Sequence, residues 1–283
     1  MRLWKHIFGL LALILGLIFL GIDRAPDAKL HLIACDVGQG DAILLIYQDK
    51  QMLIDSGPND SVVSCLGRHM PFWDKTLEAA VITHPQKDHM SGLIAILDSY
   101  RVKQLFAPDL TNDIADYWAL KESIVKNNVP VTELLAGDQL RFGALDFRVL
   151  WPKQKGDERV LGAKDPTDPN VFSTVLLGEF GQSRFLLTGD IDAAIEKQLL
   201  SEGLSGVEVL KVAHHGSKYS SSSEFLEKVL PKVALISAGQ KNRFGHPTTE
   251  VLNRLTAVGA KILRTDELGD IELSSNGSTW MIE

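Results

Sequence analysis

The sequence predicts an α/β domain preceded by a short N-terminal apolar segment. Beyond residue 28, runs rich in apolar and β-branched residues alternate with stretches of helical spacing, and turn residues separate them. The chain has 283 residues, of which 45% are hydrophobic, and no abrupt change of composition follows residue 30. About 250 residues suffice for one large core or for two packed sheets. We therefore expect an N-terminal segment with its linker over residues 1–28 and one domain over 29–283.

The N-terminal segment has the features of a membrane anchor. Arg2 and Lys5 precede the sixteen uncharged residues Ile7 to Ile22, a polarity that places the chain after the run on the far side of a membrane. The run is short for a span of about 20 residues, and no A-x-A-like cleavage site follows it. We expect an uncleaved, single-pass signal anchor with an extracytoplasmic domain. A cleaved signal peptide, which would make the protein secreted, and a buried cytoplasmic helix are the alternatives.

The first half of the domain predicts strands followed by a helix. The expected elements are strands at Leu30 to Cys35, Ala42 to Tyr47, Gln51 to Ile54 and Ala79 to Ile82, and a helix over Gly92 to Tyr100. Because only a short turn joins the second and third strands, we expect an antiparallel start.

The second half predicts further alternation of strands and helices. Strands are expected at Phe185 to Leu187, Val209 to Ala213, Val233 to Ser237 and Lys261 to Arg264, and helices over Ile114 to Asn127, Ile191 to Ser201, Ser222 to Val229 and Thr248 to Ala257. The segment Trp151 to Pro169 is rich in glycine, proline and charge, which indicates a surface loop near the entrance of the site.

Three short segments at or soon after the ends of apolar runs carry metal-binding residue types. They are His84-Pro85-Gln86-Lys87-Asp88-His89, Thr188-Gly189-Asp190 and His214-His215-Gly216-Ser217. A lone histidine at the end of a strand is more often a packed or surface residue than a ligand. Five of the eight histidines, however, lie in the first and third of these segments and at His246. Imidazole and carboxylate bind zinc, manganese or iron and leave a position open for water. The sequence therefore predicts a metallohydrolase.

These segments resemble the metallo-β-lactamase superfamily, and the full set resembles one branch of it, the soluble domain of the ComEC/Rec2 competence proteins. The resemblance runs from about His31 to the C-terminus. Its motifs are Asp36-Val37-Gly38-Gln39-Gly40-Asp41, Leu53 to Gly57, His84 to His89, Leu186 to Asp190, Leu210 to Ser217 and Gly245-His246-Pro247. The resemblance implies an αββα sandwich that binds one or two divalent ions, zinc or manganese.

The family pattern implies a role for each candidate ligand. His84 would bind one metal, Asp88 and His89 the other, and Asp190 would bridge the two. Either His214 or His215 would complete the set, and both remain open. We expect Asp88 and Asp190 to be catalytic.

Two further residues would support the site without being ligands. Asp55 suits a carboxylate that orients a ligand histidine better than one that binds metal. His246 is expected either to contact a substrate phosphate or act as a general acid, or to be a simple loop residue before the next helix.

Two residues depart from the superfamily pattern. Gln86 occupies a position that is His or Asp in most relatives, and an amide oxygen is a poorer zinc ligand than imidazole or carboxylate. The first metal site is therefore expected to be weak. Asn170 replaces a histidine of many superfamily members, although the competence branch resembles this chain in having Asn near Ser173.

The glycine-rich motif from Asp36 to Asp41 lacks G-K-[ST] and opens no helix, which argues against a P-loop. We expect a tight turn beside the metals in which Asp41 hydrogen-bonds the loop. Asp36 and Asp41 are both kept as residues that could support or bind a metal.

Four remaining candidates are expected to be structural. Cys35 and Cys65 resemble neither a zinc pair nor a disulfide framework, and Cys65 lies in a loop-like stretch. His31 and His69 lack partners nearby in the sequence.

The net charge of −7 argues against a surface that holds polyanions by charge alone, so a phosphate-bearing substrate would be held by the metal site. Together with the resemblance, this favours a metal-dependent phosphodiesterase or nuclease linked to DNA uptake, with single-stranded DNA as a candidate substrate. A catalytically weakened binding module is the alternative. The site resembles neither a true β-lactamase nor a glyoxalase-type thiolesterase. Because this chain has no multi-helix channel region, moving DNA would require a separate membrane channel protein.

Overall fold

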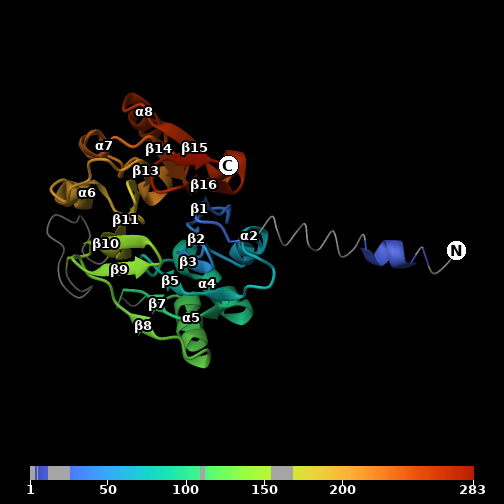
Figure 1. The fold of residues 1–283 in the computed structure, drawn as a ribbon. Coiled ribbons are helices and arrows are strands. Elements are labelled where there is room, and N and C mark those ends of the chain that lie inside the picture. The colour runs from blue at the N-terminus through green and yellow to red at the C-terminus, as the bar shows by residue number, and fades with distance from the viewer. Residues whose placement is uncertain (1–3, 5, 12–25, 109–111, 154–167) are drawn as a thin grey trace.

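The computed structural model describes residues 4, 6–11, 26–108, 112–153 and 168–283, and the domain in it is built of four layers. Two sheets pack face to face, with helices α2, α4 and α5 on the outside of one and α6, α7 and α8 on the outside of the other (Figure 1). This is the αββα sandwich that the family resemblance implied.

The first sheet has eight strands in the described residues, antiparallel on one side and parallel on the other. From β17 to β3 the neighbours are antiparallel, and from β3 to β8 they are parallel. The expected antiparallel start is confirmed. In spatial order the strands are β17 (Trp280–Ile282), β16 (Ile271–Ser275), β1 (Leu30–Ala34), β2 (Ile43–Tyr47), β3 (Lys50–Ile54), β5 (Ala79–Val81), β7 (Leu105–Phe106) and β8 (Val131–Thr132).

The second sheet repeats this mixture with seven described strands. Neighbours are parallel from β15 to β12 and antiparallel from β12 to β9. The spatial order is β15 (Lys261–Arg264), β14 (Val233–Ile236), β13 (Val209–Lys211), β12 (Ser183–Leu187), β11 (Val175–Phe180), β10 (Leu145–Trp151) and β9 (Gln139–Phe142). A separate short ribbon pairs β4 (Thr76–Leu77) with β6 (Arg101–Val102).

The helices follow the strands that they cover. On the first sheet's side lie α2 (Ser61–His69), α3 (Lys87–Met90), α4 (Gly92–Ser99) and α5 (Ala115–Lys126). The second half contributes α6 (Ala193–Leu199), α7 (Ser223–Val229), α8 (Thr249–Ala257), α9 (Thr265–Leu268) and the 3₁₀ turns η1 (Pro169–Phe172) and η2 (Ala213–Gly216). The predicted serine cap of α7 is confirmed, because the Ser222 hydroxyl accepts a hydrogen bond from the Phe225 amide.

Strand alternation explains the three hydrophobic layers of the core. In β1, Leu30 and Leu32 face the other sheet, whereas Ile33 faces the helices of its own side. The central layer lies between the two sheets and includes Phe147 and Phe185, whose rings meet edge to face. Because both sheets are buried on both faces, polar side chains are left mainly for the sheet edges and loops.

The structure corrects several expectations about the first half of the domain. Cys35 and Cys65 form a disulfide with a Cα–Cα distance of 5.8 Å, so the prediction that they resemble no disulfide framework is wrong. The pairing arises because Cys65 belongs to helix α2, not to a loop, and α2 packs on the end of β1. A separation of 30 residues gave no local sign of this contact.

His31 and His69 also have partners. The expectation that none is nearby in sequence is wrong for His31, whose Nε2 lies 3.0 Å from Asp27, and the other partners come from the far end of the chain. Both imidazoles bind Glu272 on β16, at 2.7 Å and 3.3 Å, and His69 binds Asp270 at 3.0 Å. Their expected structural role thus has a physical basis that local sequence did not reveal. His31, His69, Asp270 and Glu272 are called the surface cluster below.

Two predicted segments lie largely outside the described residues. Of the expected anchor, residues 6–11 are helical, and residues 12–25 are not described. Within the described part of the chain, no helix has the length and apolar character needed to cross a membrane. Of the expected loop from Trp151 to Pro169, residues 154–167 are not described, and its two ends belong to β10 and η1.

Candidate metal centre

Seven of the sequence-predicted residues meet at one edge of the sandwich. Parallel strands β3 and β5 of one sheet and β12 and β13 of the other end there, and each is followed by polar residues. The residues that gather are Asp41, Asp55, His84, Asp88, His89, Asp190 and His215.

His84 is fully buried and presents one free nitrogen. Its Nδ1 lies 3.0 Å from the Thr83 hydroxyl and 3.2 Å from the Ser173 hydroxyl. Since the Thr83 hydroxyl donates to Asp55, its oxygen can accept the Nδ1 proton of His84. Nε2 has no hydrogen-bond partner. Burial, and after it the neighbouring His89, lowers the pKa of His84 to about 3, so the ring is neutral, as a metal ligand must be.

His89 is held by Asp55. The Asp55 carboxylate lies 2.8 Å from His89 Nδ1 and also accepts from the Thr83 amide at 2.8 Å. His89 Nδ1 therefore carries a proton, and Nε2 faces Asp190 Oδ2 at 3.3 Å. This is the geometry that the expected orienting role of Asp55 requires. The role itself stays a prediction.

His215 is fixed in the same way from the other sheet. Its Nδ1 lies 3.0 Å from the Ser237 carbonyl oxygen and must donate to it. Nε2 then points to Asp88 and Asp190, 3.4 Å from a carboxylate oxygen of each. The His214 side chain is 31% exposed, and its Nε2 is 3.9 Å from Asp190. Between the two histidines that the sequence left open, His215 has the buried, carboxylate-facing position of a ligand.

The backbone at this edge is strained at three residues. Asp55, His214 and His215 have φ of 57°, 51° and 53°, in the left-handed region that other residues than glycine rarely adopt. Such conformations cost about 1–3 kcal/mol each and cluster at functional sites. Here these three backbone conformations set the direction of the Asp55 carboxylate and of the two imidazoles at the point where each strand has ended.

Gly40 explains the glycine-rich motif. A Cβ at this position would lie 2.3 Å from the carbonyl oxygen of Asp88, and φ is +148°. The next amide, that of Asp41, donates to the same oxygen at 3.1 Å. The expected tight turn is thus one that holds the backbone of helix α3, which carries Asp88 and His89.

Opposite charges dominate the electrostatics of the cluster. Burial would raise the pKa of Asp190, but His215 and His89 outweigh it and hold that pKa well below its usual range. Burial would likewise lower the pKa values of His89 and His215, yet Asp190 raises both. A bound cation would compete for the nitrogens that carry these protons.

Asp41 was expected to hydrogen-bond the loop, but only its backbone does so, and its carboxylate faces Lys211 and His215 instead. Its carboxylate lies 2.8 Å from the buried Lys211 ammonium and 3.2 Å from His215 Nδ1. Burial opposes ionisation of Asp41, but Lys211 and His215 lower its pKa. The paired charges keep a carboxylate behind the imidazole.

The donor set fits a divalent cation. The buried side-chain atoms that lack a hydrogen-bond partner within the described structure include Nε2 of His84, His89 and His215 and Oδ1 of Asp190. Such orphaned buried polar atoms are rare and require an explanation. His84, His89 and Asp190 form one group of ligand atoms within 4.8 Å of one another, and Asp88, His89 and His215 form a second. Imidazole and carboxylate are the ligands of zinc and manganese.

The two residues that depart from the family pattern lie at the border of this centre. Gln86 precedes helix α3 as its N-cap residue, and its carbonyl oxygen accepts from the His89 and Met90 amides. Asn170 lies in η1, and its side-chain oxygen is buried without a hydrogen-bond partner. Neither residue contributes imidazole or carboxylate to the first group, and the expectation that this group is the weaker one stays a prediction.

Asp36 does not reach the metal centre. It is exposed, its carboxylate accepts from the Gly38 amide, and its own amide donates to Asp270 of the surface cluster. The expectation that Asp36 could support or bind a metal is therefore wrong, because the turn after β1 directs it away from Asp41.

His246 lies beside the centre. Its ring packs against that of His214 at 5.8 Å, and its Nδ1 is buried without a partner. Burial, followed by His214, lowers its pKa to about 4, so the ring is neutral near pH 7. This position suits the expected contact with a substrate phosphate.

Sequence reasoning missed the residues that hold the ligands from behind. Thr83 and Ser173 bind His84, Ser237 fixes His215, and Lys211 balances Asp41. Of these residues, only Lys211 could have been predicted from the sequence. It lies in the middle of the apolar run Val209 to Ala213, and a buried lysine requires a partner of opposite charge.

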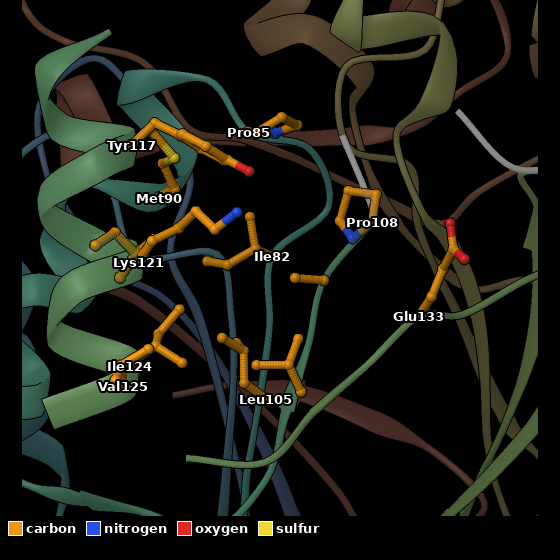
Figure 2. A pocket seen from close by; sticks show the side chains of 13 residues that line it. Ile82, Pro85, Met90, Leu105, Pro108, Tyr117, Lys121, Ile124, Val125 and Glu133 are labelled. Carbon is orange, nitrogen blue, oxygen red and sulfur yellow. The ribbon is translucent and has the colours of Figure 1, made fainter. Parts of the chain in front are cut away.

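An apolar cavity of about 500 Å³ adjoins the metal-binding segment. Ile82, Pro85 and Met90 line it from the side of that segment, and Tyr117 and Ile124 project into it from α5 (Figure 2). The described residues that line it include no histidine. This cavity is therefore distinct in chemistry from the polar centre next to it.

Comparison with known proteins agrees with the fold and the centre. Residues 35–240 match the model of the Metallo-beta-lactamase superfamily. ComE operon protein 3 of Bacillus subtilis is 32% identical over 93% of this chain and 35% of its own length. Recombination protein 2 of Haemophilus influenzae is 30% identical over 84% of this chain and 28% of its own length. The metallo-beta-lactamase fold protein YhfI of Bacillus subtilis superposes with a TM-score of 0.56 at 11% identity, covering 90% of this chain and 100% of that one.

The resemblance to the ComEC/Rec2 competence proteins is confirmed by these relatives, of which this chain spans about a third. The matched residues include Asp41, Asp55, His84 to His89, Asp190 and His215, that is, the whole of the buried centre. On the fold, the centre and the matched model, the chain belongs to the metallo-beta-lactamase superfamily, whose members are generally metallohydrolases.

Proposed function

We propose that the protein is a metal-dependent phosphodiesterase that cleaves single-stranded DNA. The observation that carries this proposal is the convergence of the free nitrogens of His84, His89 and His215 on Asp190. Each of these imidazoles has its Nδ1 occupied by a protein partner, so its Nε2 points inward, where a bound cation would take the place of a proton.

The residues of the centre would have three different roles, namely metal binding, contact with the phosphate and positioning of the ligands. Nε2 of the three histidines, with Asp88 and Asp190, would hold one or two zinc or manganese ions. When bound, such ions lower the pKa of a coordinated water to about 7 and polarise a phosphoryl oxygen. His246, neutral and with a free Nδ1, is placed to hydrogen-bond a phosphate or the leaving oxygen. Asp55 and Asp41 keep the ligand rings in position.

The choice of DNA rests on the relatives and on charge. One relative is named as a recombination protein, a name that refers to a DNA process. Since the net charge is −7, a polyanion would depend on the centre and its immediate surroundings for binding.

Metal analysis of the purified protein, followed by a substrate screen, tests the proposal. The substrates are single-stranded DNA, bis-p-nitrophenyl phosphate and phosphorylcholine esters. We expect bound zinc or manganese, and hydrolysis of the first two substrates that is lost on chelation and restored by metal. If the metal-loaded protein hydrolyses none of the three substrates, the proposed phosphodiesterase activity is refuted.

A binding module with the same fold is the second candidate, and Gln86 is the observation that favours it. With an amide in place of the family's usual ligand, the group around His84 would remain empty and the protein would bind ligands without turning them over. One metal per chain together with DNA binding but no cleavage would favour this alternative.

We further propose that the domain works outside the cytoplasm, tethered by the N-terminal apolar run. The Cys35–Cys65 disulfide supports this, because disulfides persist in oxidising compartments and are rare in the cytosol. A tether would keep an acidic enzyme near incoming polymer and near a separate membrane channel protein. Fractionation should place the full-length chain in the membrane pellet, open to external protease and with both cysteines blocked to thiol reagents. A soluble form that begins near Ala25 to Leu30 would indicate secretion, and a reduced cytosolic form would refute the location.

A further inference from the structure

Two exposed aromatic rings lie on the loops that border the metal centre. Phe244 is 54% exposed and lies two residues before His246, and Tyr219 is 66% exposed and lies four residues after His215. Each ring is paired with a cation. The Arg243 guanidinium lies 5.1 Å from the Phe244 ring centre, and the Lys218 ammonium lies 5.2 Å from that of Tyr219.

Phe244 is linked to the centre through ring contacts. It stacks on His246 with 5.9 Å between ring centres and 25° between planes, and His246 packs on His214. A planar group laid on the free face of Phe244 would thus continue a row of rings that leads to Asp190.

The loop that presents Phe244 is held firmly. The Asn242 side-chain oxygen accepts from the amides of Phe244 and His246, at 3.2 Å and 3.0 Å. The Asn242 amide group donates to the carbonyl oxygens of Gly239 and His246. The exposure of Phe244 is therefore built into the loop.

The two loops also touch each other. The Thr248 amide donates to the Gly216 carbonyl oxygen at 2.9 Å, and Arg254 donates to that of Lys218 at 3.1 Å. The two aromatic–cation pairs consequently belong to one continuous border of the site.

Neither cation forms an ion pair with a carboxylate of the described residues, although the chain carries 36 acidic residues. Single exposed apolar residues are common and need no explanation. An exposed ring with an unpaired cation over it, beside a centre that would bind phosphate, offers both parts of a nucleotide a partner.

We propose that Phe244 and Tyr219 are stacking platforms for the bases of single-stranded nucleic acid, and that Arg243 and Lys218 contact its phosphates. This rests on the proposed phosphodiesterase function and names how its substrate is held. Stacking on aromatic rings is independent of sequence, since every base has a π-face. It requires an unpaired strand, whose bases are free to leave their neighbours. Stacking also supplies binding that an acidic protein lacks from charge alone.

The test is binding of a fluorescent single strand of about 16 nucleotides, within the site size of such binders. Its affinity is measured by anisotropy in EDTA, which prevents cleavage, and is compared with that of an abasic strand of equal length. The full-length wild type, Phe244→Ala, Phe244→Trp and Phe72→Ala are compared. Phe72 is the matched control, because it is also an exposed phenylalanine with an aromatic neighbour, in the loop after α2.

We expect Phe244→Ala to weaken binding of the base-bearing strand about tenfold or more. Phe244→Trp should restore it, and Phe72→Ala should leave it unchanged. The abasic strand should bind the wild type at least as weakly as the normal strand binds Phe244→Ala, because it also loses stacking on Tyr219. Equal affinity of wild type and Phe244→Ala, equal affinity for both strands, or no binding by the wild type would overturn the proposal.

Hydrolysis of bis-p-nitrophenyl phosphate by the metal-loaded wild type separates this proposal from the proposed activity. Binding that depends on Phe244, without hydrolysis of the ester or of DNA, would refute the phosphodiesterase and keep the base-stacking site. Hydrolysis of the ester, together with DNA binding that does not change in Phe244→Ala, would support the phosphodiesterase and refute the base-stacking site.

Discussion

The metal centre and the surface cluster are built from the same side-chain types, histidine and carboxylate, but their imidazoles are bound differently. In the surface cluster, His31 gives one nitrogen to Glu272 and the other to Asp27, and His69 gives one to Glu272 and the other to Asp270. In the metal centre, each buried imidazole uses Nδ1 for a protein partner and leaves Nε2 without a hydrogen bond.

This difference in hydrogen bonding identifies the surface cluster as a set of ion pairs and the metal centre as a set of candidate ligands. Cys65, His69 and Asp270 come within 4.8 Å of one another, as the ligands of the centre do. Yet Cys65 is bound in the disulfide, and both nitrogens of His69 are occupied. Proximity of metal-binding residue types is therefore insufficient, and an imidazole nitrogen without a hydrogen-bond partner is the better criterion.

Removal of a ligand should have the largest effect. Asp88→Ala should reduce hydrolysis about 100-fold or more and lower the bound metal, because the group that it shares with His89 and His215 loses its carboxylate. The fold should survive, since Asp88 lies at the border of the core. Metal content, hydrolysis rate and circular dichroism are measured together.

The matched control is Asp270→Ala in the surface cluster, which should keep full metal and activity. An Asp88→Ala protein with unchanged metal and rate would mean that Asp88 is no ligand. Equal losses in both variants would mean that the free nitrogens do not distinguish the clusters.

The next largest effect should come from the residue behind a ligand. Asp55→Asn keeps the shape of the side chain but removes the charge that holds the Nδ1 proton of His89. Loss of such a partner typically costs 10–100-fold in metal affinity. Isothermal titration with zinc and manganese measures this, with Glu272→Gln as the control in the surface cluster. Unchanged affinity in Asp55→Asn would show that Asp55 serves folding alone.

An added ligand should have a smaller effect. Gln86→His exchanges an amide for an imidazole next to His84 and should raise metal affinity in that group. We expect up to about one further equivalent of Mn²⁺ per chain, and a faster rate if that ion was limiting. Titration that shows the same stoichiometry and rate as the wild type would place residue 86 outside the ligand set.

Local patterns in the sequence predicted the elements whose formation depends on near neighbours. Strand β15 and the start of α7 were predicted to the residue, and the strands that carry the ligands were found from their apolar runs. The hairpin of β16 and β17 was not predicted, because β16 is held by pairing with β1, some 240 residues earlier.

In the candidate site, too, the sequence predicted what depends on near neighbours and missed what depends on distant contacts. His84, Asp88, His89, Asp190 and His215 stand at strand ends, where the sequence indicates them, and the structure brings them together. Asp36 and Asp41 lie in one motif, yet one turns to the surface and the other to Lys211. The direction of a turn, the disulfide and the bonds of His31 and His69 to Asp270 and Glu272 all depend on contacts distant in sequence, which a local pattern does not contain.

The smallest effect expected is a pH dependence of stability that belongs to the surface cluster. Hydrogen bonding to Glu272 raises the pKa of His31, and Asp270 and Glu272 raise that of His69 against the effect of burial. The carboxyl pKa values fall to about 2, for Glu272 through its bonds to both histidines and for Asp270 through His69 against burial. The histidine contribution is complete below their unfolded pKa of about 6.5 and is lost as pH rises through the raised folded values. The carboxyl contribution is complete above about 4.5 and is lost as pH falls towards about 2.

The cluster should therefore stabilise the fold most between about pH 4.5 and 6.5. His69→Gln, which keeps a hydrogen-bonding side chain without a titrating one, should be less stable than the wild type at pH 6 by up to about 1 kcal/mol, because both histidines are partly exposed. The difference should shrink at pH 9. Urea unfolding in EDTA measures it with the disulfide intact, and the titration of the metal-free centre cancels between the two proteins. A constant difference from pH 6 to pH 9 would mean that His69 acts through packing rather than charge, and the contrast with the metal centre would then rest on the free nitrogens alone.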